Sequence, residues 1–362
     1  MTAWRFIAQR ALTGEFLDLE LPLALSSLKW DLSGPGSLVG TVAPDTGALR
    51  APDGRLLLEE WGTLVYAEAD GEIRWGGIVI SSGFQGPEWT IEAAGFTTYP
   101  HGLPFLDTLS EVGADPADVV RKLWQHVQAH PDGNLGVQVV GSTGARLGTP
   151  KVDGDNTSGP YELLWWDAPD VGQEIDSLAQ EASFDYVEEH AWDGDEISHT
   201  VRIGYPRLGR FRDDLAFVQG DNVSNVVAPT IDGDDFANEV VGLGAGEGRA
   251  ALRRSTAVRD GRLRRARVYS GKDVTSAARL DALIRDELQR RRDTLTIDSV
   301  EVTDHPNAPI GSWAVGDDVL IQAELPWLGD VELRCRITAW ELLSDSRARL
   351  TLARSSSFTY GG

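Results

Sequence analysis

The sequence predicts an α+β fold that is mostly β, in which an α+β insertion separates two related small β-barrels. Stretches of alternating apolar residues near both ends of the chain predict the barrels, and helical periodicity in the middle predicts the insertion. A match between the two β stretches predicts that the barrels are related. We expect a first barrel domain at 1–106, an α+β middle domain at 107–215 and a second barrel domain at 216–362 with one helix at about 275–292.

The composition is that of a globular protein with several domains. Its 362 residues and 41% hydrophobic content suffice for two or three cores. A formal net charge of −23 argues against a nucleic-acid-binding surface, because such binding depends on Lys and Arg displacing counterions from phosphates. Cys335 is the single cysteine, which excludes an intramolecular disulfide and a cysteine-based metal site.

No stretch of the sequence predicts a membrane span or an export signal. Apolar runs fall short of the roughly 18 residues that a span needs. The amino terminus lacks an apolar core followed by a small-residue cleavage site. We therefore expect the chain to fold in a cytoplasm.

Strands joined by turns are expected before the middle domain. Trp4–Ala8 is the first candidate strand, and Phe16–Leu21 alternates with the period of a half-buried strand. A meander follows from Trp61 to Ala94, in which Asp70-Gly71 joins two alternating runs as in a β-hairpin. The Gly76-Gly77 pair in its second strand predicts a bulge or tight corner, where a Cβ atom would be in the way.

The middle domain should contain two helices and a hairpin. Asp115 is placed to cap a helix that begins at Pro116, since Asp favours the N-cap and Pro the first helical position. A second amphipathic helix begins near Gly172, and Asp193-Gly194 then joins two strands of a hairpin. The side chains expected on the buried face of the first helix are Val120, Leu123, Trp124 and Val127.

The stretch from Phe217 to Gly248 connects the middle domain to the last part of the chain. Its first half is rich in turn residues, and its second half is a short apolar run, Phe236–Val241, followed by glycines at every second position. That spacing differs from the G-x-G-x-x-G fingerprint of dinucleotide-binding folds. We interpret these glycines as a strand end where another backbone approaches closely.

A helix and a second meander are expected after the glycines. Thr275 and Ser276 precede the helix, whose apolar stripe comprises Leu280, Leu283, Ile284 and Leu288. The strands that follow align with the first meander at a nearly constant offset, which predicts two barrels of the same topology. The matched pairs are Arg74 with Arg334, Ile78 with Ile337, and Ile91 with Leu350.

No group of residues predicts catalysis or a cofactor site. Carboxylates and histidines gather in the hairpin, but no hydroxyl or thiol nucleophile stands in a recognisable motif beside them. The residues concerned are Asp185, Glu188, Glu189, His190 and His199.

No metal site is predicted either. His126 and His130 have the spacing of two zinc ligands on a helix, but the intervening Glu of a zinc protease and a nearby third ligand are missing. A polar stretch further on resembles a calcium loop only faintly, and we expect a plain turn there. Its oxygen-bearing residues are Asp153, Asp155 and Asn156.

The sign of the charge reverses locally between Arg249 and Arg267, where eight Arg occur in a chain otherwise rich in acid. A solvated strand pair would explain them. So would a docking patch for an acidic neighbouring subunit, because complementary potentials steer association and fix register. We favour docking, and the candidate subunit-docking residues are Arg253, Arg254, Arg264 and Arg265.

Four short motifs occur in a suggestive order: WGGIVI in the first meander, GYPRLG after the hairpin, FAN-E-V with its G-x-G-x-G tail, and GDDV before the last strands. Together they resemble the hub or minor tail proteins of long-tailed actinobacterial phages, in the family of tail-associated baseplate-hub proteins. The resemblance implies tail-tube-like barrels and a homotrimer, in which three chains present six barrels to a sixfold tube.

The resemblance implies a structural virion protein rather than an enzyme. At the tail tip it would form a trimeric ring that closes the distal end of the tail tube and opens for DNA passage, after assembly in the host cytoplasm. Its partners would be the distal tail protein, the tape measure protein and tail-tip or fibre proteins, with DNA met only in transit. Because an acidic wall lets DNA slide, we expect acidic residues along the channel and the Arg-rich stretch against protein. The chain stops at Gly362, so we expect any fibre or lysin to be a separate protein.

Two other functions stay open on the residues alone. The abundant carboxylates would permit a tail-associated cell-wall hydrolase. A carbohydrate-binding adhesin would stack sugars on Trp165-Trp166 or on Trp327, although we expect these tryptophans in the core.

Overall fold

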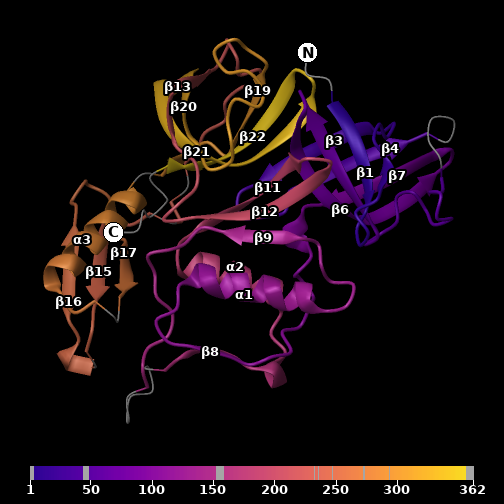
Figure 1. The fold of residues 1–362 in the computed structure, drawn as a ribbon. Coiled ribbons are helices and arrows are strands. Elements are labelled where there is room, and N and C mark those ends of the chain that lie inside the picture. Colours follow the sequence, from indigo (N-terminus) through magenta and orange to yellow (C-terminus); the bar gives the residue numbers. More distant parts are fainter. Residues whose placement is uncertain are drawn as a thin grey trace.

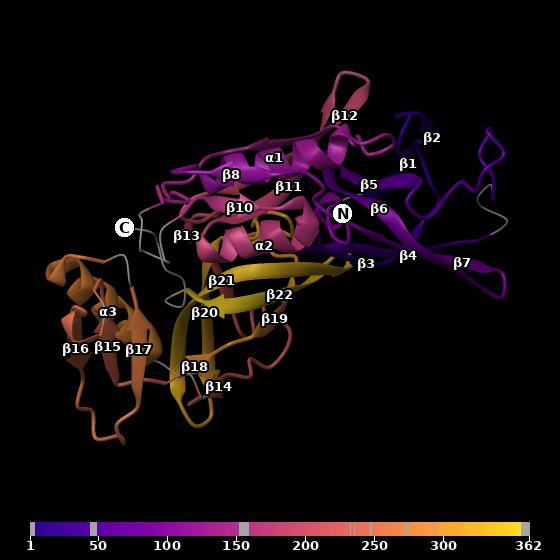
Figure 2. The same ribbon diagram turned by 90° about the horizontal axis from the view of Figure 1, so that it is seen from below.

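The computed structural model describes residues 4–43, 49–151, 159–231, 233–234, 236–246, 248–271, 274–292 and 294–355. Figures 1 and 2 show a mostly β chain in which two helices lie together on the middle region, and a third helix stands to one side with a small sheet. The predicted α+β, mostly β class is confirmed. No helix in the described part of the chain is both long and apolar enough to cross a membrane.

The first seven strands form an antiparallel unit in the order β3-β4-β7-β6-β5-β1-β2. Asp70 and Gly71 take φ angles of 54° and 80° in the β5–β6 turn, the left-handed backbone that a tight hairpin needs. The predicted meander is therefore confirmed. The strands are β1 Trp4–Arg10, β2 Phe16–Asp18, β3 Ala24–Asp31, β4 Ser37–Val42, β5 Thr63–Ala69, β6 Glu72–Gln85 and β7 Glu88–Ala94.

The Gly76-Gly77 pair marks a close approach, and the bulge lies just before it. The register shifts between Ala67 and Glu68, whose partners are Trp75 and Ile73, so Arg74 is the extra residue. A Cβ atom on Gly77 would lie 2.2 Å from the Trp75 ring. Only glycine leaves room for that ring against the strand.

The middle region packs two helices against the sheet β11-β12-β9. Asp115 caps α1 by accepting a hydrogen bond from the backbone N of Ala117, and the four side chains predicted for its buried face are all buried. Tyr66 of the first unit shares a core with Trp124 of α1, which fixes this region on that unit. The elements are β8 Leu109–Glu111, α1 Pro116–Ala129, β9 Val137–Val140, β10 Tyr161–Leu163, α2 Val171–Glu181, β11 Asp185–Asp193 and β12 Glu196–Gly204, with short 3₁₀ turns at Phe96–Thr98 and Trp165–Asp167.

The last strands form a second unit whose order repeats that of the first. The order β13-β20-β21-β22-β19 corresponds to β1-β5-β6-β7-β4, as the aligned meanders predict. The units differ at one edge, because β13 runs parallel to β20 whereas β1 runs antiparallel to β5. The strands are β13 Phe211–Val218, β19 Ser299–Thr303, β20 Asp318–Leu325, β21 Gly329–Ser344 and β22 Arg347–Arg354.

Strand β21 joins the two units because it is longer than β20. β20 pairs with β21 as far as Arg336, and β3 pairs with β21 from Ala339 to Leu342. The strands consequently form a continuous 12-stranded sheet, and no closed barrel occurs in the described part of the chain.

A small lobe, defined as residues 236–292, is inserted between β13 and β19 (Figure 1). Helix α3 packs on one face of the sheet β16-β15-β17, and the short pair β14–β18 holds the two connections to the lobe together. A Cβ atom on Gly242 would lie 2.6 Å from Cγ2 of Ile284, and one on Gly244 would lie 2.7 Å from the backbone O of Val274. The close neighbour is therefore a side chain of α3 at Gly242 and another backbone, as predicted, at Gly244. The elements are β14 Thr230–Ile231, β15 Glu239–Leu243, a 3₁₀ turn at Gly248–Ala250, β16 Arg253–Ala257, β17 Ala266–Ser270, α3 Ala277–Arg292 and β18 Leu295–Thr296.

Candidate functional site

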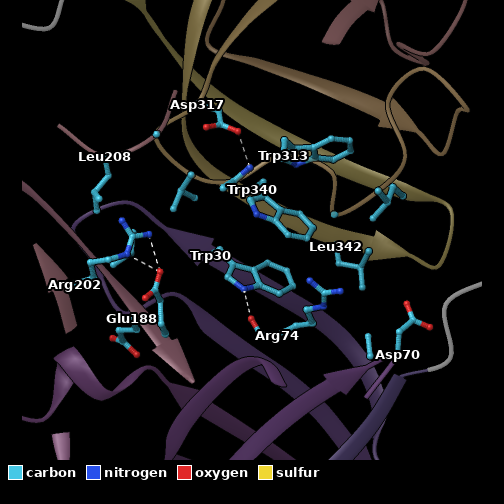
Figure 3. A pocket seen from close by; sticks show the side chains of 18 of the residues that line it. Trp30, Asp70, Arg74, Glu188, Arg202, Leu208, Trp313, Asp317, Trp340 and Leu342 are labelled. Carbon is cyan, nitrogen blue, oxygen red and sulfur yellow. Dashed lines mark hydrogen bonds and ion pairs between the residues drawn. The ribbon is translucent and has the colours of Figure 1, made fainter. Parts of the chain in front are cut away.

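Four tryptophans line a pocket on the seam between the two β units (Figure 3). Trp30 on β3 is the register partner of Trp340 on β21, and their rings stack with centroids 3.9 Å apart and planes 6° apart. Nε1 of Trp30 donates to the backbone O of Arg74 at 2.8 Å. Trp313 meets Trp340 edge-on at 6.0 Å, and Trp4 is tilted against Trp30 at 6.3 Å. The pocket has a volume of about 520 Å³, within the range of small-molecule sites.

The hairpin carboxylates at this pocket are held by other groups. Glu188 accepts hydrogen bonds from the backbone N atoms of Phe96 and Thr97, both at 2.7 Å, so it fixes the turn after β7. Glu189 pairs with Nη2 of Arg202 at 2.6 Å on the neighbouring strand. These contacts give both carboxylates a structural role, because each holds a neighbouring segment in place.

The two hairpin histidines lie opposite each other and face the first β unit. Nδ1 of His190 lies 3.1 Å from Nδ1 of His199. The ring of Tyr66 stacks on His199 with centroids 5.8 Å apart, and its hydroxyl donates to Oε1 of Gln9 at 2.9 Å. Burial, with His190 as the second cause, lowers the pKa of His199 to about 3, so this ring is neutral near pH 7. The chain of contacts joins the hairpin to β1 and β5.

The two helix histidines lie side by side on α1. Nε2 of His126 lies 3.4 Å from Nε2 of His130 and accepts a hydrogen bond from the backbone N of Leu106 at 3.3 Å. No group of three His, Cys, Asp or Glu side chains within the described residues could hold a metal ion. The faint calcium-loop residues Asp153, Asp155 and Asn156 lie outside the described residues.

The four arginines predicted to dock a partner all lie on the small lobe, but on different sides of its sheet. Arg253 and Arg254 are successive residues of β16, so their side chains point to opposite faces. Arg254 turns to the helix side, where its Nε and Nη2 hold Asp281 of α3 at 2.7 and 2.6 Å. Arg264 holds Glu239 at 2.8 and 2.9 Å, and this hydrogen bonding lowers the pKa of Glu239 to about 2.

The four therefore differ in what they can offer a partner. Arg265 donates its backbone N–H to the Asn238 side chain at 2.8 Å, and its Nη2 reaches the backbone O of Asp234 at 3.5 Å. Arg253 is exposed and makes no ion pair within the described residues. Within the described residues, no carboxylate balances the charge of Arg253 or of Arg265, whose side chain reaches only a backbone carbonyl.

None of the described residues covers the sheet face of the lobe that points away from α3. Leu243 is the register partner of Arg253, and Val241 is the partner of Val268, so these side chains share that face. Leu243 is 37% exposed and Val268 is 66% exposed. Exposed apolar side chains that gather with charges around them are typical of protein contacts. We call this surface the open face, and its residues are Glu239, Val241, Leu243, Arg253, Ser255, Ala257, Ala266, Val268 and Ser270.

The tryptophans expected in the core at three positions are exposed instead. Trp165 and Trp166 follow β10 in a short 3₁₀ turn and meet edge-on with centroids 5.7 Å apart. Trp327 is 96% exposed at the tip of the β20–β21 hairpin. It lies in the turn beyond the last register pair, Leu325 with Gly329.

Comparison with known proteins identifies the fold. No protein-family model matches the sequence, and no curated protein sequence matches it. Among solved structures, the 43 kDa tail protein of prophage MuSo2 from Shewanella oneidensis superposes with a TM-score of 0.58 at 12% identity, over 99% of this chain and 100% of that one. The chain has the fold of a tail protein.

Two further structures agree with this result. The tail protein from Neisseria meningitidis MC58 has a TM-score of 0.57 at 14% identity, over 98% of both chains. Prophage tail protein gp18 from Listeria monocytogenes EGD-e has a TM-score of 0.52 at 11% identity, over 97% of this chain and 95% of that one. Because each match covers nearly the whole of both chains, the arrangement of the regions is similar as well as the separate sheets.

Proposed function

We propose that this chain is a structural protein of a phage tail, and that three copies form the hub ring that closes the distal end of the tail tube. The observation that carries the proposal is the end-to-end likeness of its fold to tail proteins, at 99% and 98% coverage of this chain in two cases. The contacts of the hairpin carboxylates, which serve the fold, support a role other than hydrolysis.

The repeated strand order supports a ring of three. Each chain carries two units with the same strand order. We propose them as two domains on either side of a middle domain, predicted at 1–106, 216–362 and 107–215, with the last boundary moved to Phe211, where β13 begins. Three chains then place six similar units around one axis, and that number suits a sixfold tube. Three-fold closure requires heterologous contacts, in which two different surfaces of the chain meet.

The charge distribution supports passage of DNA through the ring. With a net charge of −23, the chain has enough acidic side chains to line a channel that does not retain a polyanion. The Arg-rich lobe then faces protein. Its neighbours in the virion would be the distal tail protein, the tape measure protein and tail-tip or fibre proteins.

The oligomeric state tests the ring. Native mass spectrometry and sedimentation of the purified chain should give a mass about three times 39.3 kDa. A monomer or a dimer over the whole accessible concentration range would contradict the trimer. As a check on hydrolysis, the protein should release no fragments from peptidoglycan, and release that disappears in Glu189→Gln would favour an enzyme instead.

A further inference from the structure

The tip of the β20–β21 hairpin combines an exposed aromatic ring with unbalanced negative charge. Trp327 at the turn is 96% exposed and Leu328 beside it is 46% exposed. Glu324 and Asp330 are direct register partners just below the turn, and neither makes an ion pair within the described residues. Like charges opposite each other are unfavourable unless a cation reaches them. The tip therefore suits a partner that is apolar and positively charged.

The sequence around the tip contains no charge of its own that could neutralise these carboxylates. Between residues 319 and 333 three acidic side chains occur and no Lys or Arg. Asp317 and Asp318 lie at the other end of β20, buried and paired with arginines. Glu332 is the one near the turn with a side-chain partner, since Gln322 donates to it at 2.8 Å. An exposed Trp beside two carboxylates without a cation, Glu324 and Asp330, is typical of a binding anchor with charge at its edge.

The open face of the lobe carries the complementary groups. Leu243 and Val268 supply the apolar surface, and Arg253 beside Leu243 supplies a cation with no ion pair within the described residues. The one acidic member of the face, Glu239, is held by Arg264 at 2.8 Å and by Arg259 at 3.3 Å, so its charge is compensated. A guanidinium can also lie over the face of an indole ring.

We infer that the hairpin tip of one copy docks on the open face of a second copy of this chain. Trp327 packs on Leu243 and Val268, and Arg253 reaches Glu324 and Asp330. The tip and the open face are different surfaces of one chain, so each copy offers its tip to one neighbour and its open face to the other. Such a heterologous contact can close a ring of three, whereas a two-fold contact pairs a surface with itself. The inference rests on the proposed trimer and names the surfaces that hold it together.

Disulfide trapping tests the contact while leaving its anchors in place. Leu328→Cys is combined with Ser255→Cys, which lies on the open face next to Arg253. The native thiol does not interfere, because burial raises the pKa of Cys335 to about 12 and the side chain is inaccessible. Oxidised protein should run without reductant as linked species of two and three chains, and reductant should return them to one.

The matched control pairs Ser255→Cys with Leu106→Cys, an exposed leucine between β7 and β8, and this variant should run as a single chain. A disulfide formed within a single chain would assign the open face to the hairpin of the same copy and overturn the inference. The inference would also be wrong if protein with both Leu328→Cys and Ser255→Cys formed no disulfide at all.

Charge reversal provides an independent test. Trp327→Ala and Arg253→Glu should each raise the concentration at which the trimer dissociates by about tenfold or more. Adding Glu324→Arg and Asp330→Arg to Arg253→Glu should bring the dissociation concentration part of the way back, because the positive and negative charges have then exchanged surfaces. The dissociation concentration should stay unchanged in two control variants at exposed residues away from both surfaces, Trp165→Ala and Arg50→Glu.

The two proposals can fail separately. If the native protein is a trimer and neither Trp327→Ala nor Arg253→Glu weakens it, the docking inference is wrong and the ring stands. If the native protein is a monomer, both are wrong.

Discussion

Arg336 should hold the last β unit to the middle region, and its replacement is the sharpest stability test that the structure offers. The side chain is 1% exposed. Its Nη2 pairs with Asp185 on β11 and donates to the backbone O of Leu208 at 2.8 Å, and its Nε donates to the backbone O of Gly316 at 3.1 Å. Arg336→Met keeps much of the apolar stem and leaves the Asp185 carboxylate without its cation.

The expected loss follows from the burial of this pair. Breaking a buried ion pair by removing one partner costs about 3–5 kcal/mol. The Asp185 side chain keeps 16% of its exposure, so water can approach it, and we expect a loss in the free energy of unfolding near the lower end, about 3 kcal/mol. Urea unfolding followed by tryptophan fluorescence measures it, with Trp313 and Trp340 as reporters in the last β unit.

Arg349→Met is the matched control. Arg349 is exposed and pairs with Glu301 at 2.9 Å and Glu341 at 3.3 Å, and exposed pairs of this kind contribute less than about 1 kcal/mol. If Arg336→Met lowers stability no more than Arg349→Met does, the reasoning about the junction is wrong.

Two further predictions concern the histidine cluster and the lobe. The folded-state pKa of His199, about 3, lies below its ordinary value of 6.5, so its stabilisation is complete above pH 6.5 and is lost as the pH falls towards 3. Thermal unfolding between pH 7 and 4 should show a loss of up to about 1.4 kcal/mol per pH unit from this group, and an unchanged slope in His199→Gln would refute the assignment. Gly242→Ala would place a Cβ 2.6 Å from Ile284 and should speed hydrogen exchange in α3 through about 1–3 kcal/mol of overpacking. Gly159→Ala, where a Cβ meets nothing within 4 Å, should leave α3 exchange unchanged, and equal exchange in both variants would count against the packing argument.

Local chemistry made several elements predictable. Asp115 and Pro116 mark the start of α1, because capping and ring geometry act within one turn of helix. Asp70-Gly71 marks the β5–β6 hairpin, because the turn needs left-handed backbone at both positions. The alignment of the two meanders predicted the repeated strand order, since it depends on several matched positions in sequence.

Contacts between distant strands were not predictable in the same way. The pairing of β21 with β3 depends on β21 extending past β20, and nothing near Trp30 or Trp340 in the sequence indicates that their rings stack. The lobe was missed because its strands are short: β15 has 5 residues and ends among glycines, so its alternation is too brief to show a separate sheet.

The candidate docking surface was predicted only in part. Eight Arg in one stretch indicated a positive region, but the sequence does not show that Arg254 and Arg264 are engaged within the lobe. The apolar half of the open face was also missed, because Val241 and Val268 meet only through the register of β15 and β17. Trp327 was expected in the core because a large apolar side chain usually is buried, and its place in the turn reverses that expectation.

Electron cryomicroscopy of the purified assembly would show the ring itself. We expect a closed ring of three chains with six β units around one channel, acidic side chains along its wall and the Arg-rich lobe against a neighbouring chain. A two-fold dimer, an open filament, or a ring with Arg253, Arg254, Arg264 and Arg265 lining the channel would contradict it.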